Sequence, residues 1–401
     1  MLPALRRDLD IMPSPVPDRP GILIRDPMRY SDAVLIIPYA LAGALECFDG
    51  AHSELDLRAA ILEHVPADAA AIHQQMIHAL QSSAFVDDEA FAEIKSARES
   101  EFAQASVREP AHAGSGYPTE LKALNETMRG YVDPARLSVD GAGTIAIAAP
   151  HVSPFGGWQC YRAAYQSLPR NAGEGTFVIL GTSHYGPADR FGLTRKSFRT
   201  PLGDARPNLE IIDRLSRRAA AAITEEDYCH SVEHSIEFQV LFLQWLYGPD
   251  IRIVPILCGS FARSIYLGGM PEQNDGVNRF IGELGEIAAQ ADRNLTWVLG
   301  VDMAHIGRRY GDAIPAHANR EHMVEVSQRD HMRNQRVIAG DADGFWDLVQ
   351  QNRDDLRWCG SSPFYTFLRA VQGIRGTVER YEQWNIDDAS VVSFAGICFT
   401  R

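Results

Sequence analysis

Features that mark membrane and exported proteins are absent from this sequence of 401 residues. No run reaches the roughly 18 consecutive apolar residues that suggest a membrane-spanning helix. Arg6 and Arg7 lie near the N-terminus, but no apolar stretch of signal-peptide length follows them. We therefore expect a cytoplasmic protein with no membrane partner.

Basic residues are in short supply. The chain has 38 Lys and Arg against 52 Asp and Glu, and its formal net charge is -14. Binding to a phosphate backbone depends on clustered Lys and Arg, so an acidic chain of this kind is a poor match for it. We expect no nucleic-acid partner.

Cysteine is also scarce. The six cysteines are widely scattered and form no C-x-x-C pair. This pattern favours reduced cytosolic thiols over a disulfide framework or a structural zinc site.

Several catalytic and nucleotide-binding motifs are missing as well. The chain contains neither G-x-G-x-x-G nor G-x-x-x-x-G-K-[ST], so a nucleotide has no obvious phosphate cradle. Ser153 and Ser183 lie in no G-x-S-x-G elbow, which argues against a serine hydrolase.

The length and pattern of the chain indicate two domains, because 401 residues exceed the usual size of one hydrophobic core. Residues 21–25 and 33–37 are short β-branched runs separated by Asp26-Pro27, and apolar residues at helical spacing follow Ser53. Residues 1–105 are thus predicted to be a small α+β domain that is winged-helix-like. Phe48-Asp49-Gly50 followed by a helix resembles the PqqD-like peptide-binding domains, and a structural appendage without a ligand is an equal alternative.

The rest of the chain, residues 106–401, predicts an α/β domain. Nearly continuous apolar runs alternate with helical stretches, which is typical of a mostly parallel sheet flanked by helices. Pro255 suggests that the third run is an edge strand or carries an irregularity. The runs are residues 144–149, 177–180, 251–257, 295–299 and 391–399.

Three of these predicted strands are each followed by a histidine: His151, His184 and His305. Ligands of open α/β sheets bind in the crevice outside the carboxyl ends of the strands. Any one of these histidines is more simply explained as a hydrogen-bonded core residue, but several at one sheet edge indicate a site.

A further cluster, residues 229–237, precedes an apolar helical stretch. His230 and His234 are four apart and share a face if both are helical, although His230 is also compatible with a position before the helix. Neutral imidazole suits Fe, Cu, Zn and Ni, and two histidines plus a carboxylate are the usual non-haem Fe(II) arrangement. The candidate carboxylates are Glu233, Glu237 and Asp302.

Seven segments resemble, in order along the chain, the motifs of the Memo family. Many bacterial members are called AmmeMemoRadiSam system protein B, and some carry a leading domain. The segments are residues 107–117, 149–151 (Ala-Pro-His), 181–184 (Gly-Thr-Ser-His), 233–237 (Glu-His-Ser-Ile-Glu), 302–305 (Asp-Met-Ala-His), 359–363 (Cys-Gly-Ser-Ser-Pro) and 390–396.

The Memo family in turn resembles the extradiol (class III) dioxygenases, which use non-haem iron. This resemblance implies an extradiol dioxygenase-like fold in which His151, His184 and His234 bind the metal. It also implies that His305 acts as acid and base. Asp302 and Glu233 complete the candidate catalytic set, each as a ligand or as a partner that fixes a histidine tautomer.

Ala304 departs from the family pattern as we interpret it. Relatives that bind iron or copper have a cysteine at the position we align with Ala304, and a methyl group cannot bind a metal. We therefore expect the pocket to lack this thiolate, and the third ligand to be His234, Asp302 or water.

The resemblance implies a non-haem oxidoreductase with a transition metal, Fe(II) first and Cu or Zn as alternatives, acting on a small molecule or peptide. The alternative is a non-catalytic metal-binding adaptor with a vestigial dioxygenase site, working with a radical SAM partner system. An accessible metal position beside a substrate-sized pocket would favour the enzyme.

Overall fold

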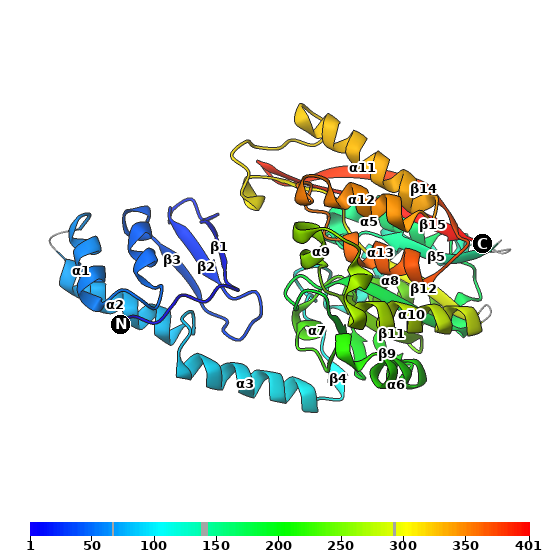
Figure 1. Ribbon diagram of the computed structural model, residues 1–401, viewed down its shortest axis with the longest axis horizontal. Coiled ribbons are helices and arrows are strands. Elements are labelled where there is room, and N and C mark those ends of the chain that lie inside the picture. Colours follow the sequence, from blue (N-terminus) through cyan, green and yellow to red (C-terminus); the bar gives the residue numbers. More distant parts are fainter. Residues whose placement is uncertain (66–67, 138–142, 292–293) are drawn as a thin grey trace. The chain divides into compact units, whose positions relative to one another are not determined.

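The computed structural model describes residues 1–65, 68–137, 143–291 and 294–401. The chain forms two compact units, Met1–Gln104 and Ala105–Arg401 (Figure 1). The first unit ends at Gln104, one residue before the domain end expected from the sequence.

The first unit is small and contains both helices and strands. Its three strands form an antiparallel sheet in the order β1-β2-β3, and β2 and β3 are the two strands that the sequence predicted. Helix α1 begins after Ser53, whose hydroxyl accepts from the backbone N–H of Asp56 in a capping box. The elements are β1 (Asp10–Pro13), β2 (Ile22–Arg25), β3 (Val34–Ile37), η1 (Tyr39–Cys47), α1 (Glu54–Leu62), α2 (Ala69–Ser82) and α3 (Glu89–Gln104).

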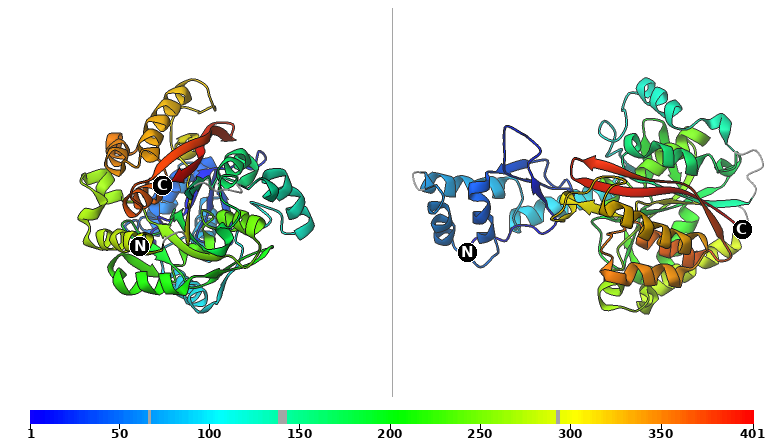
Figure 2. Two further views of the ribbon diagram at one scale, coloured as in Figure 1. Left: turned by 90° about the vertical axis from the view of Figure 1, so that its right-hand side faces the viewer. Right: turned by 90° about the horizontal axis from the view of Figure 1, so that it is seen from above.

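The second unit is built on a sheet of twelve strands among the described residues, and its central strands are parallel. The order β5-β12-β6-β11 runs through the middle, and the β14–β15 hairpin, red in Figure 2, adds antiparallel strands beside β5. The predicted α/β fold is thereby confirmed. The strands are β4 (Val107–Arg108), β5 (Thr144–Ala149), β6 (Thr176–Thr182), β7 (Phe191–Leu193), β8 (Ser197–Thr200), β9 (Gly203–Pro207), β10 (Ile223–Glu225), β11 (Arg252–Cys258), β12 (Leu295–Gly300), β13 (His305–Gly307), β14 (Arg375–Asp387) and β15 (Ser390–Thr400).

Helices cover both faces of this sheet. Trp297 of β12 contacts Phe367 of α13, whereas Gly300, three residues on, faces Gln239 of α8. Side chains at an odd spacing on a strand point to opposite faces, so α8 and α13 lie on opposite sides. The helices are α4 (Leu121–Tyr131), α5 (Pro154–Tyr165), α6 (Leu209–Arg218), α7 (Cys229–Val232), α8 (Glu237–Tyr247), α9 (Ala262–Leu267), α10 (Asp275–Gln290), α11 (His322–Ile338), α12 (Ala342–Gln350) and α13 (Ser361–Ala370), with short 3-10 turns η2 (Pro134–Arg136), η3 (Ala172–Glu174), η4 (Ala220–Ala222), η5 (Pro271–Gln273), η6 (Arg308–Tyr310) and η7 (Gln351–Arg353).

Pro255 does not mark an edge strand, so that alternative was wrong. Strand β11 is interior, with β6 on one side over its whole length. On the other side it pairs with β9 at Arg252 and Ile253, then with β7 from Ile256. Pro255 falls in the interval between these two partners, where the missing N–H breaks no ladder on that side. The predicted irregularity is therefore the alternative that holds.

A buried ion pair fixes the segment between α7 and α8. The guanidinium of Arg108 pairs with the carboxylate of Glu237, and both side chains are at most 1% exposed. Arg108 also donates to the backbone carbonyl oxygens of His230 at 2.7 Å and Glu233 at 2.8 Å. Glu237 accepts from Tyr117 and from two backbone N–H groups of the 107–117 segment. Arg108 thus clamps the stretch of chain that carries Glu233 and His234.

His230 and His234 do not share a helix face, contrary to one of the two expectations. Helix α7 ends at Val232, and the backbone is extended at Glu233. The ring of His230 is buried, and its Nε2 lies 3.1 Å from the carbonyl oxygen of Gly192, to which it donates. Burial lowers the pKa of His230 to about 4, so the ring is neutral near pH 7.

Among the described residues, none of the helices combines the length and apolar character that a bilayer crossing requires.

Replacing Arg108 by Met should lower the free energy of unfolding of the second unit by about 3–5 kcal/mol, because it leaves the buried Glu237 without its counter-charge. Urea denaturation followed by tryptophan fluorescence measures this, since all six tryptophans lie in the second unit. Arg206→Ala is the control: its pair with Asp250 is 69% and 74% exposed and should contribute little. Equal losses in the two variants would contradict the clamp.

Lowering the pH should destabilise the second unit through His230. Its pKa falls from 6.5 in the unfolded chain to about 4 in the fold, so unfolding takes up a proton between these values. The contribution of neutral His230 to the free energy of unfolding is fully present above pH 6.5. It is lost as the pH falls toward 4, by on the order of 3 kcal/mol. The slope of the unfolding free energy against pH should flatten in His230→Gln and stay unchanged in His331→Gln, where the ring is exposed. An identical slope in His230→Gln would refute this assignment.

Candidate metal centre

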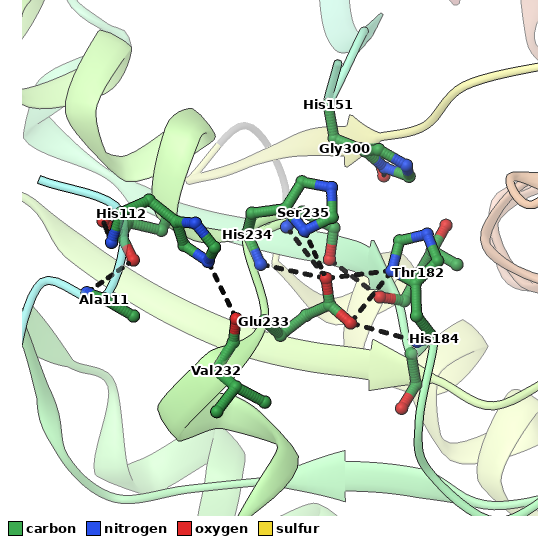
Figure 3. Close-up of polar contacts among 12 residues, drawn as sticks. Ala111, His112, His151, Thr182, His184, Val232, Glu233, His234, Ser235 and Gly300 are labelled. Atoms are coloured by element: carbon green, nitrogen blue, oxygen red, sulfur yellow. Dashed lines mark hydrogen bonds and ion pairs between the residues drawn. The ribbon is translucent and has the colours of Figure 1, made fainter. Parts of the chain in front are cut away.

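Three of the predicted histidines meet at the carboxyl edge of the parallel strands. His151 follows β5, His184 follows β6, and His234 lies between α7 and α8. Each offers one ligating nitrogen, and these three atoms lie within 4.8 Å of one another. The rings of His184 and His234 stack with centroids 5.1 Å apart, and His151 stands edge-on to both (Figure 3).

The Nδ1 atom of each ring is held by an acceptor. Nδ1 of His151 lies 2.9 Å from the carbonyl oxygen of Gly300. Nδ1 of His184 and of His234 lie 3.0 Å and 3.1 Å from the same oxygen, Oε1 of Glu233. A carbonyl or carboxylate oxygen only accepts, so Nδ1 carries a proton, and Nε2 is the nitrogen that can bind a metal once it is deprotonated (Figure 3).

Glu233 is the centre of this arrangement. Its side chain is 1% exposed and also accepts from the backbone N–H groups of His184 at 3.0 Å and His234 at 2.9 Å. Burial alone would raise the pKa of Glu233, but the charge and hydrogen bond of His184 outweigh it and hold the pKa well below its usual range. Because protein donors occupy both of its oxygens, Glu233 is placed to orient the two rings.

Asp302 supports His151 from the end of β12. Its Oδ1 accepts from the backbone N–H of His151 at 3.0 Å, and its Oδ2 lies 3.5 Å from Nε2 of that ring. Burial lowers the pKa of His151, but the charges of Asp302 and Cys359 outweigh it and raise the pKa to about 9. Asp302 therefore adds negative charge at the histidine cluster.

Ala304 brings no thiol to the pocket, but a different residue does. Ala304 is fully buried in the main hydrophobic core, and the thiol comes from Cys359, just before α13. Its Sγ lies 3.3 Å from Nε2 of His151. Burial would raise the pKa of Cys359, but the charges of His151 and His305 outweigh it and hold the pKa well below its usual value. Cys359 is part of the Cys-Gly-Ser-Ser-Pro motif, but its position in the sequence gave no indication that it lies near the histidines.

His305 lies beside the thiol rather than in the histidine cluster. It begins β13, and its Nδ1 lies 2.9 Å from the carbonyl oxygen of Met303 and 3.1 Å from that of Arg357. The ring of Tyr310 stands edge-on at 5.0 Å. These contacts hold Nδ1 and leave Nε2 as the ring nitrogen available to another partner.

Two candidates lie away from the cluster, and one unexpected residue joins it. His230 donates to Gly192, and Glu237 pairs with Arg108. His112, in contrast, places its ring 5.5 Å from that of His234, and its Nε2 donates to the carbonyl oxygen of Val232 at 2.8 Å (Figure 3). Burial lowers the pKa of His112 to about 4, so a neutral ring supports His234 from behind.

A cavity of about 300 Å³ opens beside the cluster. His184 and Cys359 form part of its wall, and Phe261, Trp346 and Trp358 form apolar parts of it. Of the three clustered histidines, His184 lines this cavity, so a ligand there would lie next to the cluster.

The donor set fits a transition metal. Three imidazole nitrogens and a nearby thiol are ligands that suit Fe, Cu and Zn, and oriented Nδ1–H groups are typical of metal-binding histidines. The described residues therefore contain a histidine group able to hold such an ion.

Comparison with known proteins gives a consistent picture. The family model described as Memo-like protein matches residues 108–398. A MEMO1 family protein of Aquifex aeolicus (strain VF5) is 24% identical over 386 residues, covering 94% of this chain and 95% of that relative. MEMO1 family protein MK0963 of Methanopyrus kandleri is 27% identical over 310 residues, covering 73% of this chain and 99% of the relative.

A solved structure, the uncharacterized protein JW3007 of Escherichia coli K12, aligns with a TM-score of 0.38 and 13% identity over 64% of this chain and 99% of that chain. The family match spans residues 108–398, well over half of the chain, and this protein belongs to the Memo family.

Proposed function

We propose that the second unit is a metal-dependent oxidoreductase of the non-haem, dioxygenase-like type. In this proposal His151, His184 and His234 bind the metal through Nε2, with Fe(II) as the first candidate and Cu or Zn as alternatives. The observation that carries it is the convergence of three ligating atoms within 4.8 Å, each ring oriented by a fixed acceptor.

A bound ion of this kind would supply open positions and redox chemistry with dioxygen as the oxidant. The chain's own residues supply the rest. Glu233 and Asp302 hold the rings in place, and Nε2 of His305, which lies near Cys359, takes up and returns a proton.

The cavity is the observation that favours an enzyme over the adaptor alternative. An adaptor with a vestigial site needs no space beside its metal, whereas a cavity of about 300 Å³ bordered by His184 and Cys359 suits a small substrate. In the adaptor alternative the first unit would grip a peptide, and a radical SAM system would be the partner.

Anaerobically purified full-length protein should contain close to one transition-metal ion per chain. His151→Ala, His184→Ala and His234→Ala should each lose most of it, because each removes one of three nitrogen ligands. Elemental analysis after reconstitution with Fe(II), Cu or Zn measures the content and the preferred ion.

His230→Ala is the matched control, since this histidine lies in the same segment but donates to Gly192. Metal retained in all three variants, or absent from the wild-type chain after reconstitution, would refute the proposed site. Metal bound without dioxygen consumption over a panel of small aromatic substrates would favour the adaptor.

Glu233→Gln should weaken metal binding by about 10- to 100-fold without removing a ligand. The amide keeps the size of the side chain but cannot accept from both rings and both backbone N–H groups at once. Competition with a chelator of known affinity measures the change, and Glu379→Gln, on the surface of β14, is the control. Unchanged affinity would show that Glu233 does not orient the ligands.

A further inference from the structure

Strand β14 is an edge of the large sheet. It runs over 13 residues, Arg375–Asp387, and pairs with β15 on its inner side. Among the described residues, no other strand pairs with it. A long edge strand of this kind can pair with a strand of another chain, because its outward backbone N–H and C=O groups have no partner in a ladder.

Both faces of this edge are hollowed. On one face, a hollow of about 550 Å³ lies between α11, which runs beside β14 in Figure 1, and residues 376–381. On the other face, a hollow of about 490 Å³ lies between α5 and the residues Glu379 and Arg380. A strand that pairs with β14 extends the sheet and brings side chains to both of its faces. The hollows give those side chains room.

The pairing of β14 with β15 is regular over only part of its length. The register shifts between Val378 and Arg380, and again between Asn385 and Asp387. Glu379 is thus the extra residue of a β-bulge. Bulges hinder a further strand from pairing at the same place. The stretch that is open to a second strand is therefore residues 380–385.

The charges on this regular stretch have both signs. Nε of Arg380 donates to Oε1 of Glu382 at 2.7 Å, and the two side chains are 49% and 19% exposed. Tyr381, between them, points to the other face, where its hydroxyl donates to Asp330 of α11 at 2.7 Å. Edge strands are commonly protected by charges that repel an incoming strand. An Arg and a Glu two residues apart instead attract a strand that carries them in the opposite order.

Twofold symmetry restricts how two β14 strands can pair. In an antiparallel pair of identical strands, residues equally far from the axis face each other. Facing residues share a face of the sheet, so the axis passes through a residue rather than between two. An axis through Arg380 or through Glu382 places like charges opposite each other, which is unfavourable. An axis through Tyr381 places Arg380 of each copy opposite Glu382 of the other, and the charges favour this register.

We propose that two copies of this chain associate through β14, antiparallel and about a twofold axis at Tyr381. The two sheets then form one sheet across the interface, and two Arg380–Glu382 pairs set its register. A second copy fits this edge better than an unrelated peptide does, because the chain itself supplies the strand with the complementary order of charges. The interface involves none of the residues of the metal centre, so it stands independently of the proposed function.

Sedimentation velocity of the full-length chain over a range of micromolar concentrations tests the proposal. The wild-type chain should shift with concentration from 44.4 kDa toward twice that mass. Arg380→Glu places carboxylates opposite each other, and Glu382→Arg does the same with guanidinium groups. Each variant should weaken association by about tenfold or more. Arg206→Glu is the control, because its side chain lies on β9 and is 69% exposed, and it should associate as the wild type does.

Mixing the two single variants separates the interface from a folding defect. In a mixed pair, the acidic side chains of the Arg380→Glu chain face the basic side chains of the Glu382→Arg chain. A heterodimer should therefore form although neither variant associates alone. The double variant Arg380→Glu/Glu382→Arg should also associate, because it only reverses the order of the charges.

Hydrogen exchange locates the interface along the chain. Amides of residues 380–385 should exchange more slowly at high than at low concentration in the wild type, and equally at both in Arg380→Glu. A wild-type chain that stays monomeric over the whole range would overturn the proposal. So would single variants that associate like the wild type, or a mixture of the two that does not associate.

Discussion

The ion pair between Arg108 and Glu237 holds the histidine cluster together. Arg108 lies close to the start of the second unit, while Glu237 lies more than a hundred residues further along the chain, at the start of α8. Taking two charges out of water is costly, and the cost is recovered only where every donor and acceptor finds a partner. Here the partners are carbonyl oxygens of the 229–237 segment and donors of the 107–117 segment, so both segments are held together.

Glu233 connects the segment held by Arg108 to the histidine cluster. The segment that Arg108 clamps presents one carboxylate to two imidazoles and two backbone N–H groups. The sheet supplies the third ring, because Gly300 at the end of β12 offers its carbonyl to His151 at the end of the neighbouring strand β5. The ring orientations therefore depend on contacts that lie outside the rings themselves.

Much of the fold follows from local pattern, and so does part of the site. The buried runs that form β5, β6, β11 and β12 are visible as continuous apolar stretches, and His151 and His184 directly follow two of them. Since parallel strands end at one edge, their proximity was predictable. The position of His234 was less so, because its segment leaves the helix at Glu233 and depends on the distant Arg108.

The features that sequence reasoning missed depend on tertiary contacts. Cys359 reaches His151 across about two hundred residues of chain, and no local spacing encodes that approach. Pro255 suggested an edge strand because proline has no N–H to donate to a neighbouring strand. The change of partner from β9 to β7, which accommodates Pro255 in an interior strand, could not be predicted because it depends on strands elsewhere in the chain. His112 supports His234 through the same long-range docking that brings Arg108 to Glu237.

The sharing of one carboxylate by two rings has a consequence for the rate at which an ion enters and leaves. In small domains that fold around a metal, the ligands separate when the ion is lost, and rebinding must wait for refolding. Here the contacts with Glu233 fix the rings of His184 and His234 from within the protein. In the proposed function, this site would therefore exchange an ion as a rigid receptor, and the supply of ions in the cell rather than folding would decide which one is bound.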